Sequence, residues 1–144
     1  MKEAARILLR RPVVGVAAAA RTADGKWVLI RRADTGTWAL PGGTLEWGET
    51  LRVGLMREME EEVGIPGVVP ERLVGVFSGP DRDPRFHAVT IVVECRVEKP
   101  SAPPKNPVEI LEVGFFGDDE LPELAMGMGD MIAAARRGGP AEID

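Results

Sequence analysis

Residues 43–65 read GTLEWGETLRVGLMREMEEEVGI and contain the clearest helix of the sequence. From Thr50 onward it contains no proline and many good helix formers, and it ends at Gly64, which is followed by Pro66. A glycine after the last helical residue and a proline shortly beyond it are typical of a helix end. We therefore predict a helix over residues 50–63.

The predicted helix carries three carboxylates on one face. At roughly 100° per residue, Glu58, Glu61 and Glu62 share an arc of about 100°. Apolar side chains occupy an adjacent arc that can pack on a sheet: Leu55, Met56, Met59 and Val63. Clustered like charges favour a cation, and oxygen ligands suit Mg²⁺ or Mn²⁺ better than zinc. The alternative is an acidic helix face that only meets water.

Strand patterns flank this helix on both sides. Apolar or β-forming runs at residues 13–20 and 27–31 are separated by a turn at Asp24-Gly25. Further strands are expected at residues 73–78, 87–97 and 109–116, and a last helix at residues 126–137. In 87–97, alternation predicts one core-facing side, which includes His87. A proline-rich connector spans residues 100–107. Because no internal repeat or second linker is found, we expect a single α/β domain over residues 1–144.

Composition excludes several classes of function. The formal net charge is −5, which argues against binding nucleic-acid backbones, because neutralising many phosphates requires a basic surface. The single cysteine, Cys95, has no partner for an internal disulfide and is expected to be a core residue. We find no signal peptide and no apolar run long enough to span a membrane, so a soluble cytoplasmic protein is expected.

The spacing of residues 43–65 resembles the signature of the Nudix hydrolase family. Gly43 is followed after five residues by Glu49 and after seven more by Arg57-Glu58-Met59-x-Glu61-Glu62-x-Gly64-Ile65. Residues 38–43, WALPGG, are similar to the family's loop that leads into this signature. The resemblance implies an α/β/α sandwich around a mixed β-sheet.

The resemblance also implies roles for individual residues. Glu58, Glu61 and Glu62 would bind Mg²⁺ (or Mn²⁺), assisted by Glu49 and by the carbonyl group of Gly43. Arg57 would pair with Glu49 and orient the site. The family hydrolyses a nucleoside diphosphate linked to a further group, using metal-activated water, so the expected partner is a small-molecule nucleotide.

Residues 78–85, SGPDRDPR, are similar to the SDPxRDPR loop of ADP-ribose pyrophosphatases, except that Gly79 stands where that subgroup carries aspartate. This implies hydrolysis of ADP-ribose or a related nucleoside diphosphate sugar to a nucleoside monophosphate and a sugar phosphate. The chain is shorter than many members of the subgroup, which raises the alternative that it lacks their extra dimer-forming strands. The sequence therefore does not decide whether the protein forms a homodimer.

Five side chains are candidates for binding the substrate: Arg31, Arg82, Arg85, His87 and Trp38. Each has an alternative role. Arg82 and Arg85 can form local ion pairs with Asp81 and Asp83, His87 can be structural, and Arg31 can end a strand in solvent. For Trp38, and for Trp47 on the other side of Pro41-Gly42-Gly43, packing competes with base stacking.

A general base is also needed if the metal-binding glutamates do not serve. Glu109 and Glu112 are both candidates, because the family often places a glutamate before its last helix, and the sequence does not choose between them. Surface carboxylates on an edge strand are the alternative.

Two other functions compete with the main one. They are a nucleoside triphosphate pyrophosphohydrolase and a non-catalytic nucleotide sensor, although the sensor predicts a broken signature and this one is intact.

Overall fold

A computed structural model describes residues 10–98 and 108–144. In this part of the chain a mixed sheet of eight strands is built around β1. β1 pairs in parallel with β6 on one edge, and its other edge is shared by β2 and β4, both antiparallel. The strands are β1 (Val13–Arg21), β2 (Trp27–Arg32), β3 (Trp38–Ala39), β4 (Gly42–Thr44), β5 (Val69–Phe77), β6 (Ala88–Arg96), β7 (Ile110–Phe116) and β8 (Glu142–Ile143).

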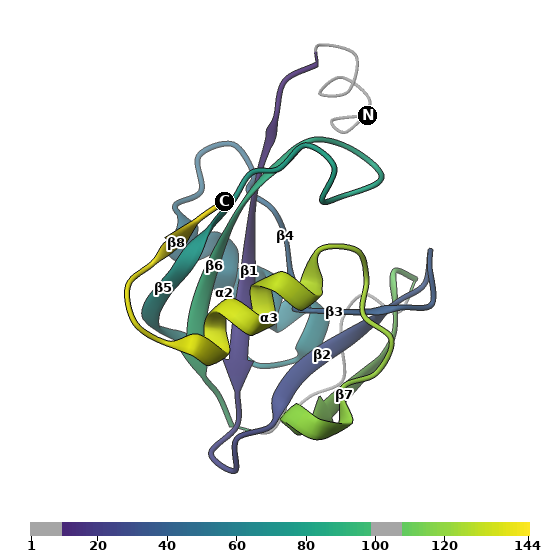
Figure 1. Ribbon diagram of the computed structural model, residues 1–144, viewed down its shortest axis with the longest axis vertical. Coiled ribbons are helices and arrows are strands. Elements are labelled where there is room, and N and C mark those ends of the chain that lie inside the picture. Colours follow the sequence, from purple (N-terminus) through teal and green to yellow (C-terminus); the bar gives the residue numbers. More distant parts are fainter. Residues whose placement is uncertain (1–9, 99–107) are drawn as a thin grey trace.

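Two α-helices cover opposite faces of the sheet, as Figure 1 shows, with α3 (Met128–Arg137) in front of the strands and α2 (Leu51–Val63) behind them. A short 3₁₀ helix, η1 (Asp118–Glu120), follows β7. The predicted α/β/α sandwich around a mixed sheet is therefore confirmed. Among the described residues, no helix is long and apolar enough to cross a membrane.

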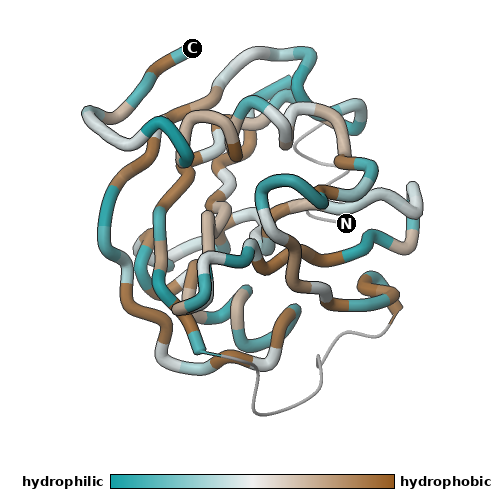
Figure 2. Tube along the Cα trace, turned by 60° about the horizontal axis from the view of Figure 1, so that its bottom comes forward, coloured by the Kyte–Doolittle hydropathy of each residue, from teal (hydrophilic) through white to brown (hydrophobic). Residues whose placement is uncertain are grey.

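Alternating side chains of β1 build two separate core layers. Val16, Ala18 and Ala20 pack in the layer with Leu55, Met59 and Val63 of α2. Ala17 and Ala19 pack in the layer with α3. Because successive side chains of a strand point to opposite faces, a nearly continuous apolar strand is what a sheet covered on both sides requires. Figure 2 shows these hydrophobic stretches along the strands, with hydrophilic stretches at the connections.

The helix α2 begins and ends where the sequence predicts. The hydroxyl group of Thr50 accepts a hydrogen bond from the Val53 amide at 3.2 Å, which satisfies one of the free N–H groups of the first turn. At the other end Gly64 adopts φ +77°, and its amide donates to the Glu60 carbonyl group at 3.1 Å. These two caps fix the length of the helix that carries the carboxylates.

The strands agree with the sequence to different degrees. Those at 13–21, 27–32, 88–96 and 110–116 match within one or two residues, whereas β5 begins four residues before the predicted start at Leu73. β3, β4 and β8 have only two or three residues and were not predicted. The proline-rich connector expected at residues 100–107 lies outside the described residues.

The expectation of a single core face on residues 87–97 is wrong. Val92 is buried in the layer next to α3, whereas Cys95 and Val97 are buried in the layer next to α2. The reason is that β6 lies between β1 and β5 in the middle of the sheet, so both of its faces are covered. His87 precedes this strand and is exposed, so its predicted core-facing position is also wrong.

Candidate active site

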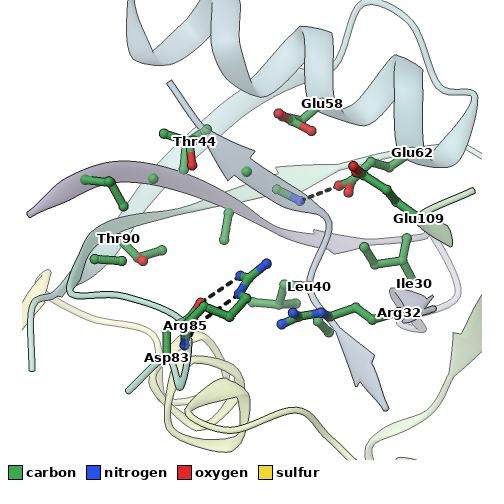
Figure 3. A pocket seen from close by; sticks show the side chains of 18 of the residues that line it. Ile30, Arg32, Leu40, Thr44, Glu58, Glu62, Asp83, Arg85, Thr90 and Glu109 are labelled. Atoms are coloured by element: carbon green, nitrogen blue, oxygen red, sulfur yellow. Dashed lines mark hydrogen bonds and ion pairs between the residues drawn. The ribbon is translucent and has the colours of Figure 1, made fainter. Parts of the chain in front are cut away.

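One cavity of about 960 Å³ opens between α2, the edge of β1 and the loop that follows β5. Carboxylates lie on one side of it, contributed by Glu58 and Glu62 of α2 and by Glu109. Arg32, at the end of β2, and Arg85, from the loop before β6, lie on the other side. Figure 3 shows the two groups facing each other across β1 and β4. The cavity thus has an acidic side and a basic side.

Arg57 organises the acidic side. Its Nε and Nη2 atoms donate to the two oxygens of Glu49 at 2.7 and 2.9 Å, and its Nη1 atom donates to Glu58 at 2.8 Å. A longer contact of 3.4 Å joins Nη1 to Glu61, whose side chain is 45% exposed. The hydrogen bonds from Arg57, together with one from the Glu46 amide, lower the pKa of Glu49 to about 2. The pairing of Arg57 with Glu49 is the one that the resemblance implied.

Glu62 is the most buried carboxylate of the cavity, with 8% of its surface exposed. Its Oε1 atom accepts a hydrogen bond from the Gly42 amide at 2.7 Å. Burial raises the pKa of Glu62 to about 8, and the nearby charges of Glu58 and Glu109 add to this shift. Burial also raises the pKa of Glu58, although Arg57 opposes the shift. On the acidic side, burial and the neighbouring carboxylates thus both work against the charged form of Glu62, whereas Arg57 favours the charged form of Glu58.

The two candidates for a general base are separated by the structure. Glu109 lies just before β7, lines the cavity and is close enough to Glu62 to affect its pKa. Glu112 does not line the cavity, and its carboxylate pairs with Nη1 of Arg31 at 3.2 Å. This pair also removes Arg31 from the substrate candidates that reach the cavity.

Of the five substrate candidates, only Arg85 lines the cavity. Its side chain is held by Asp83 through hydrogen bonds of 3.0 and 2.7 Å. The basic residue that accompanies it is Arg32, not Arg31. Arg31 and Arg32 are adjacent in the strand, and adjacent side chains of a strand point to opposite faces, so the sequence does not show which of the two faces the cavity.

The remaining candidates are engaged elsewhere. Arg82 pairs with Asp130 and Asp144 at 3.0 and 2.6 Å. The Nε2 atom of His87 lies 2.8 Å from the Ser78 carbonyl oxygen. Trp38 packs edge-on against Phe116, with ring centroids 4.9 Å apart. The packing alternative therefore describes Trp38, but Trp47 is 98% exposed and does not pack.

Several lining residues were not among the predicted site residues: Arg32, Asp34, Thr44, Glu46, Phe86, Thr90 and Met128. They come from separate segments, which only the folded sheet brings together. An arginine next to a predicted strand end and the acidic residues of the loop before α2 were the only hints available.

A family model described as the NUDIX domain matches residues 10–135. The chain belongs to the NUDIX family. It is 42% identical over 106 residues to an ADP-ribose pyrophosphatase of Methanocaldococcus jannaschii, a match that covers 71% of this chain and 60% of that protein. It is 40% identical over 114 residues to a MutT-like protein of Streptomyces ambofaciens, covering 76% of this chain and 67% of that protein.

Solved structures show the same NUDIX fold. The crystal structure of an ADP-ribose pyrophosphatase from Streptococcus suis superposes with a TM-score of 0.72 and 27% identity, covering 92% of this chain and 97% of that chain. The crystal structure of a UDP-X diphosphatase gives a TM-score of 0.74 with 25% identity, covering 99% of this chain and 74% of that chain.

Members of the NUDIX family generally use a divalent cation, and the residues of this cavity fit one. Within residues 10–98 and 108–144, no three acidic, histidine or cysteine side chains already form a metal-binding group. Arg57 holds Glu58, and the Gly42 amide holds Glu62. The donor set nevertheless consists of oxygens that line one cavity, and oxygen ligands are what Mg²⁺ or Mn²⁺ prefers. A Cβ atom at Gly43 would lie 2.5 Å from Oε1 of Glu58, so glycine at this position leaves the Glu58 carboxylate where it is.

Proposed function

We propose that this NUDIX protein is a Mg²⁺- or Mn²⁺-dependent pyrophosphohydrolase of ADP-ribose or a related nucleoside diphosphate sugar, releasing a nucleoside monophosphate and a sugar phosphate. The observation that carries this proposal is the shared cavity in which Glu58, Glu62 and Glu109 face Arg32 and Arg85. A diphosphate is itself anionic, so it needs cationic groups on one side and cation-bearing carboxylates on the other. The M. jannaschii relative, which is named an ADP-ribose pyrophosphatase, supports this substrate class.

The basic side would bind the substrate. The guanidinium groups of Arg32 and Arg85 match phosphate oxygens in a forked geometry. Arg32 pairs with Asp34, and Arg85 pairs with Asp83 at 2.7 Å, so both guanidinium groups are oriented before a substrate arrives. Such preorganisation reduces the entropy lost when the phosphates bind.

The acidic side would hold the cation. We propose that the carboxylates of Glu58 and Glu62 bind it, with Glu61, Glu49 and the Gly43 carbonyl group nearby. Arg57 would position Glu49 and Glu58. A bound divalent cation supplies neutralisation of the diphosphate charge and makes water more acidic. Glu109 is proposed to accept a proton at its carboxylate, because it lines the cavity and is close enough to Glu62 to affect the pKa of that group. Glu112 is not, because it pairs with Arg31 outside the lining.

A substrate screen tests the proposal. Purified protein is incubated with ADP-ribose, GDP-mannose, UDP-glucose, dinucleoside polyphosphates and dNTPs, with and without Mg²⁺ or Mn²⁺, and the products are identified. The proposal predicts a nucleoside monophosphate and a sugar phosphate, in equal amounts and only with the cation. Free pyrophosphate from dNTPs as the dominant product would contradict it.

A nucleoside triphosphate pyrophosphohydrolase is the second candidate. It is supported by the S. ambofaciens relative, whose name, MutT-like, does not specify a nucleotide sugar. The same screen separates the two, because only this activity releases pyrophosphate. A non-catalytic sensor would bind nucleotide with Mg²⁺ and give no product. A homodimer remains a prediction, for which light scattering of the purified protein is the test.

A further inference from the structure

The loop of residues 78–87, which joins β5 to β6, carries part of the cavity wall. Asp83, Arg85 and Phe86 line the cavity, and Arg85 is the proposed phosphate ligand of this loop. A surface loop of this length needs its backbone fixed if its side chains are to bind a substrate in one geometry. What fixes the loop is therefore part of the binding site, even where it makes no contact with the cavity.

The carboxylate of Asp144 fixes the start of this loop. Its Oδ1 atom accepts hydrogen bonds from the Ser78 amide at 2.7 Å and from the Ser78 hydroxyl group at 3.0 Å. Its Oδ2 atom accepts from the Gly79 amide at 2.9 Å and from Nε of Arg82 at 2.6 Å. Four donors thus meet one carboxylate, and they lower its pKa. Hydrogen bonds to a charged group are about twice as strong as neutral ones.

Arg82 extends this contact to α3. Its Nη1 atom donates to Asp130 at 3.0 Å, and its guanidinium group lies over the ring of Phe77, 5.0 Å from the centroid. Gly127, just before α3, approaches the same residue so closely that a Cβ atom there would lie 3.0 Å from the Arg82 carbonyl oxygen. The loop is therefore held between α3 and the segment that follows β8.

Gly79 explains why a distant carboxylate is used. A Cβ atom at Gly79 would lie 3.3 Å from both Oδ2 of Asp144 and Nε of Arg82. The place of a side chain at this position is thus taken by Asp144, which is 65 residues away in sequence. The loop lacks a carboxylate of its own at residue 79, and the chain supplies one from another element.

We infer that Asp144, acting through Arg82, is a positioning residue that sets the substrate affinity of the loop containing Arg85. The inference rests on the proposed function, since it concerns the binding of the same nucleoside diphosphate sugar. Asp144 and Arg82 do not line the cavity themselves. Their loss should therefore weaken substrate binding and leave the chemical step, which depends on α2 and Glu109, nearly unchanged.

Kinetics of variants test the inference. Asp144→Ala should raise KM for the preferred nucleoside diphosphate sugar about tenfold, the equivalent of one charge-assisted hydrogen bond, with kcat changed less than about threefold. Glu142→Gln is the matched control, because its carboxylate pairs with Arg137 at 2.7 Å and not with the loop. Adding Gly79→Asp to Asp144→Ala should return KM toward the wild-type value, because the new carboxylate lies next to Arg82.

Hydrogen exchange gives a readout that does not depend on turnover. The amides of Ser78 and Gly79 should exchange faster in Asp144→Ala than in the wild type, and the Gly54 amide in α2 should not. Unchanged exchange at Ser78 and Gly79 would overturn the inference, as would an unchanged KM or a KM that Gly79→Asp does not restore. If the wild type hydrolyses no nucleoside diphosphate sugar, the proposed function fails, and the inference about affinity fails with it. If the wild type is active and Asp144→Ala has an unchanged KM, only the inference is refuted.

Discussion

Two adjacent glycines of β4 should give opposite results when changed to alanine. A Cβ atom at Gly42 would lie 2.2 Å from the Val16 carbonyl oxygen and 2.8 Å from the Ala17 Cα atom. Both obstacles are backbone atoms of the central strand β1, so they cannot move without disturbing the sheet. Gly42→Ala should therefore lower the free energy of unfolding by about 3 kcal/mol, the upper part of the range for overpacked sites.

At Gly43 the obstacle is a side chain. The added Cβ atom would lie 2.5 Å from Oε1 of Glu58 and 2.7 Å from its Cδ atom. Ordinary contact needs the carboxylate to move by about 1 Å, which a glutamate can do by rotating, at a stability cost of about 1 kcal/mol for the weakened contact with Arg57. A displacement of this size in a positioned group can reduce turnover by about a hundredfold. Gly43→Ala should thus remain folded and lose activity.

Urea unfolding and steady-state turnover on the preferred substrate measure the two effects separately. The expected pattern is a stability defect in Gly42→Ala and an activity defect in a stable Gly43→Ala. Wild-type turnover in Gly43→Ala would refute the placement of Glu58 in the reaction. Equal destabilisation of both variants would refute the distinction between a backbone and a side-chain obstacle.

Three further predictions concern single carboxylates. Glu61→Gln and Glu62→Gln should each lower turnover by orders of magnitude while circular dichroism shows an intact fold. The Glu61 side chain is 45% exposed, and a glutamine amide oxygen at residue 62 can still accept the hydrogen bond from the Gly42 amide. The pKa of Glu62 is raised to about 8 in the folded protein, so without metal the free energy of unfolding of the wild type should fall as the pH rises from about 4.5 to 8. Glu62→Gln should not show this fall. Parallel curves of unfolding free energy against pH for the two proteins would contradict this prediction. Glu109→Gln should reduce kcat by about 10²–10³-fold and Glu112→Gln by less than about threefold, and the reverse order would exchange their roles.

Much of the fold could be predicted because its signals are local. The cap residues Thr50 and Gly64 mark the ends of α2, and their effects depend only on neighbouring amides. The long strands show as apolar runs for the same reason. β3, β4 and β8 could not be predicted, because two or three residues carry no periodicity and their pairing depends on strands elsewhere in the sheet.

The candidate site was predictable on the helix and much less so outside it. Helical spacing alone brings Glu58 and Glu62 to one face, and both line the cavity. The choice between Arg31 and Arg32 depends on which face of β2 meets the cavity, which is a property of the sheet. For Arg82 the sequence offers a phosphate or a local aspartate as partner. Its partner Asp144 instead lies 62 residues away, a contact that no local pattern reveals.

Binding of Mn²⁺ to the protein shows whether the acidic face of α2 holds a divalent cation against a nucleotide. Titration calorimetry is carried out with saturating AMP on the wild type, on Glu62→Gln and on Glu112→Gln. We expect Mn²⁺ uptake by the wild type and by Glu112→Gln, and a strongly weakened uptake by Glu62→Gln. Absence of uptake in the wild type, or equal uptake by all three proteins, would contradict this expectation.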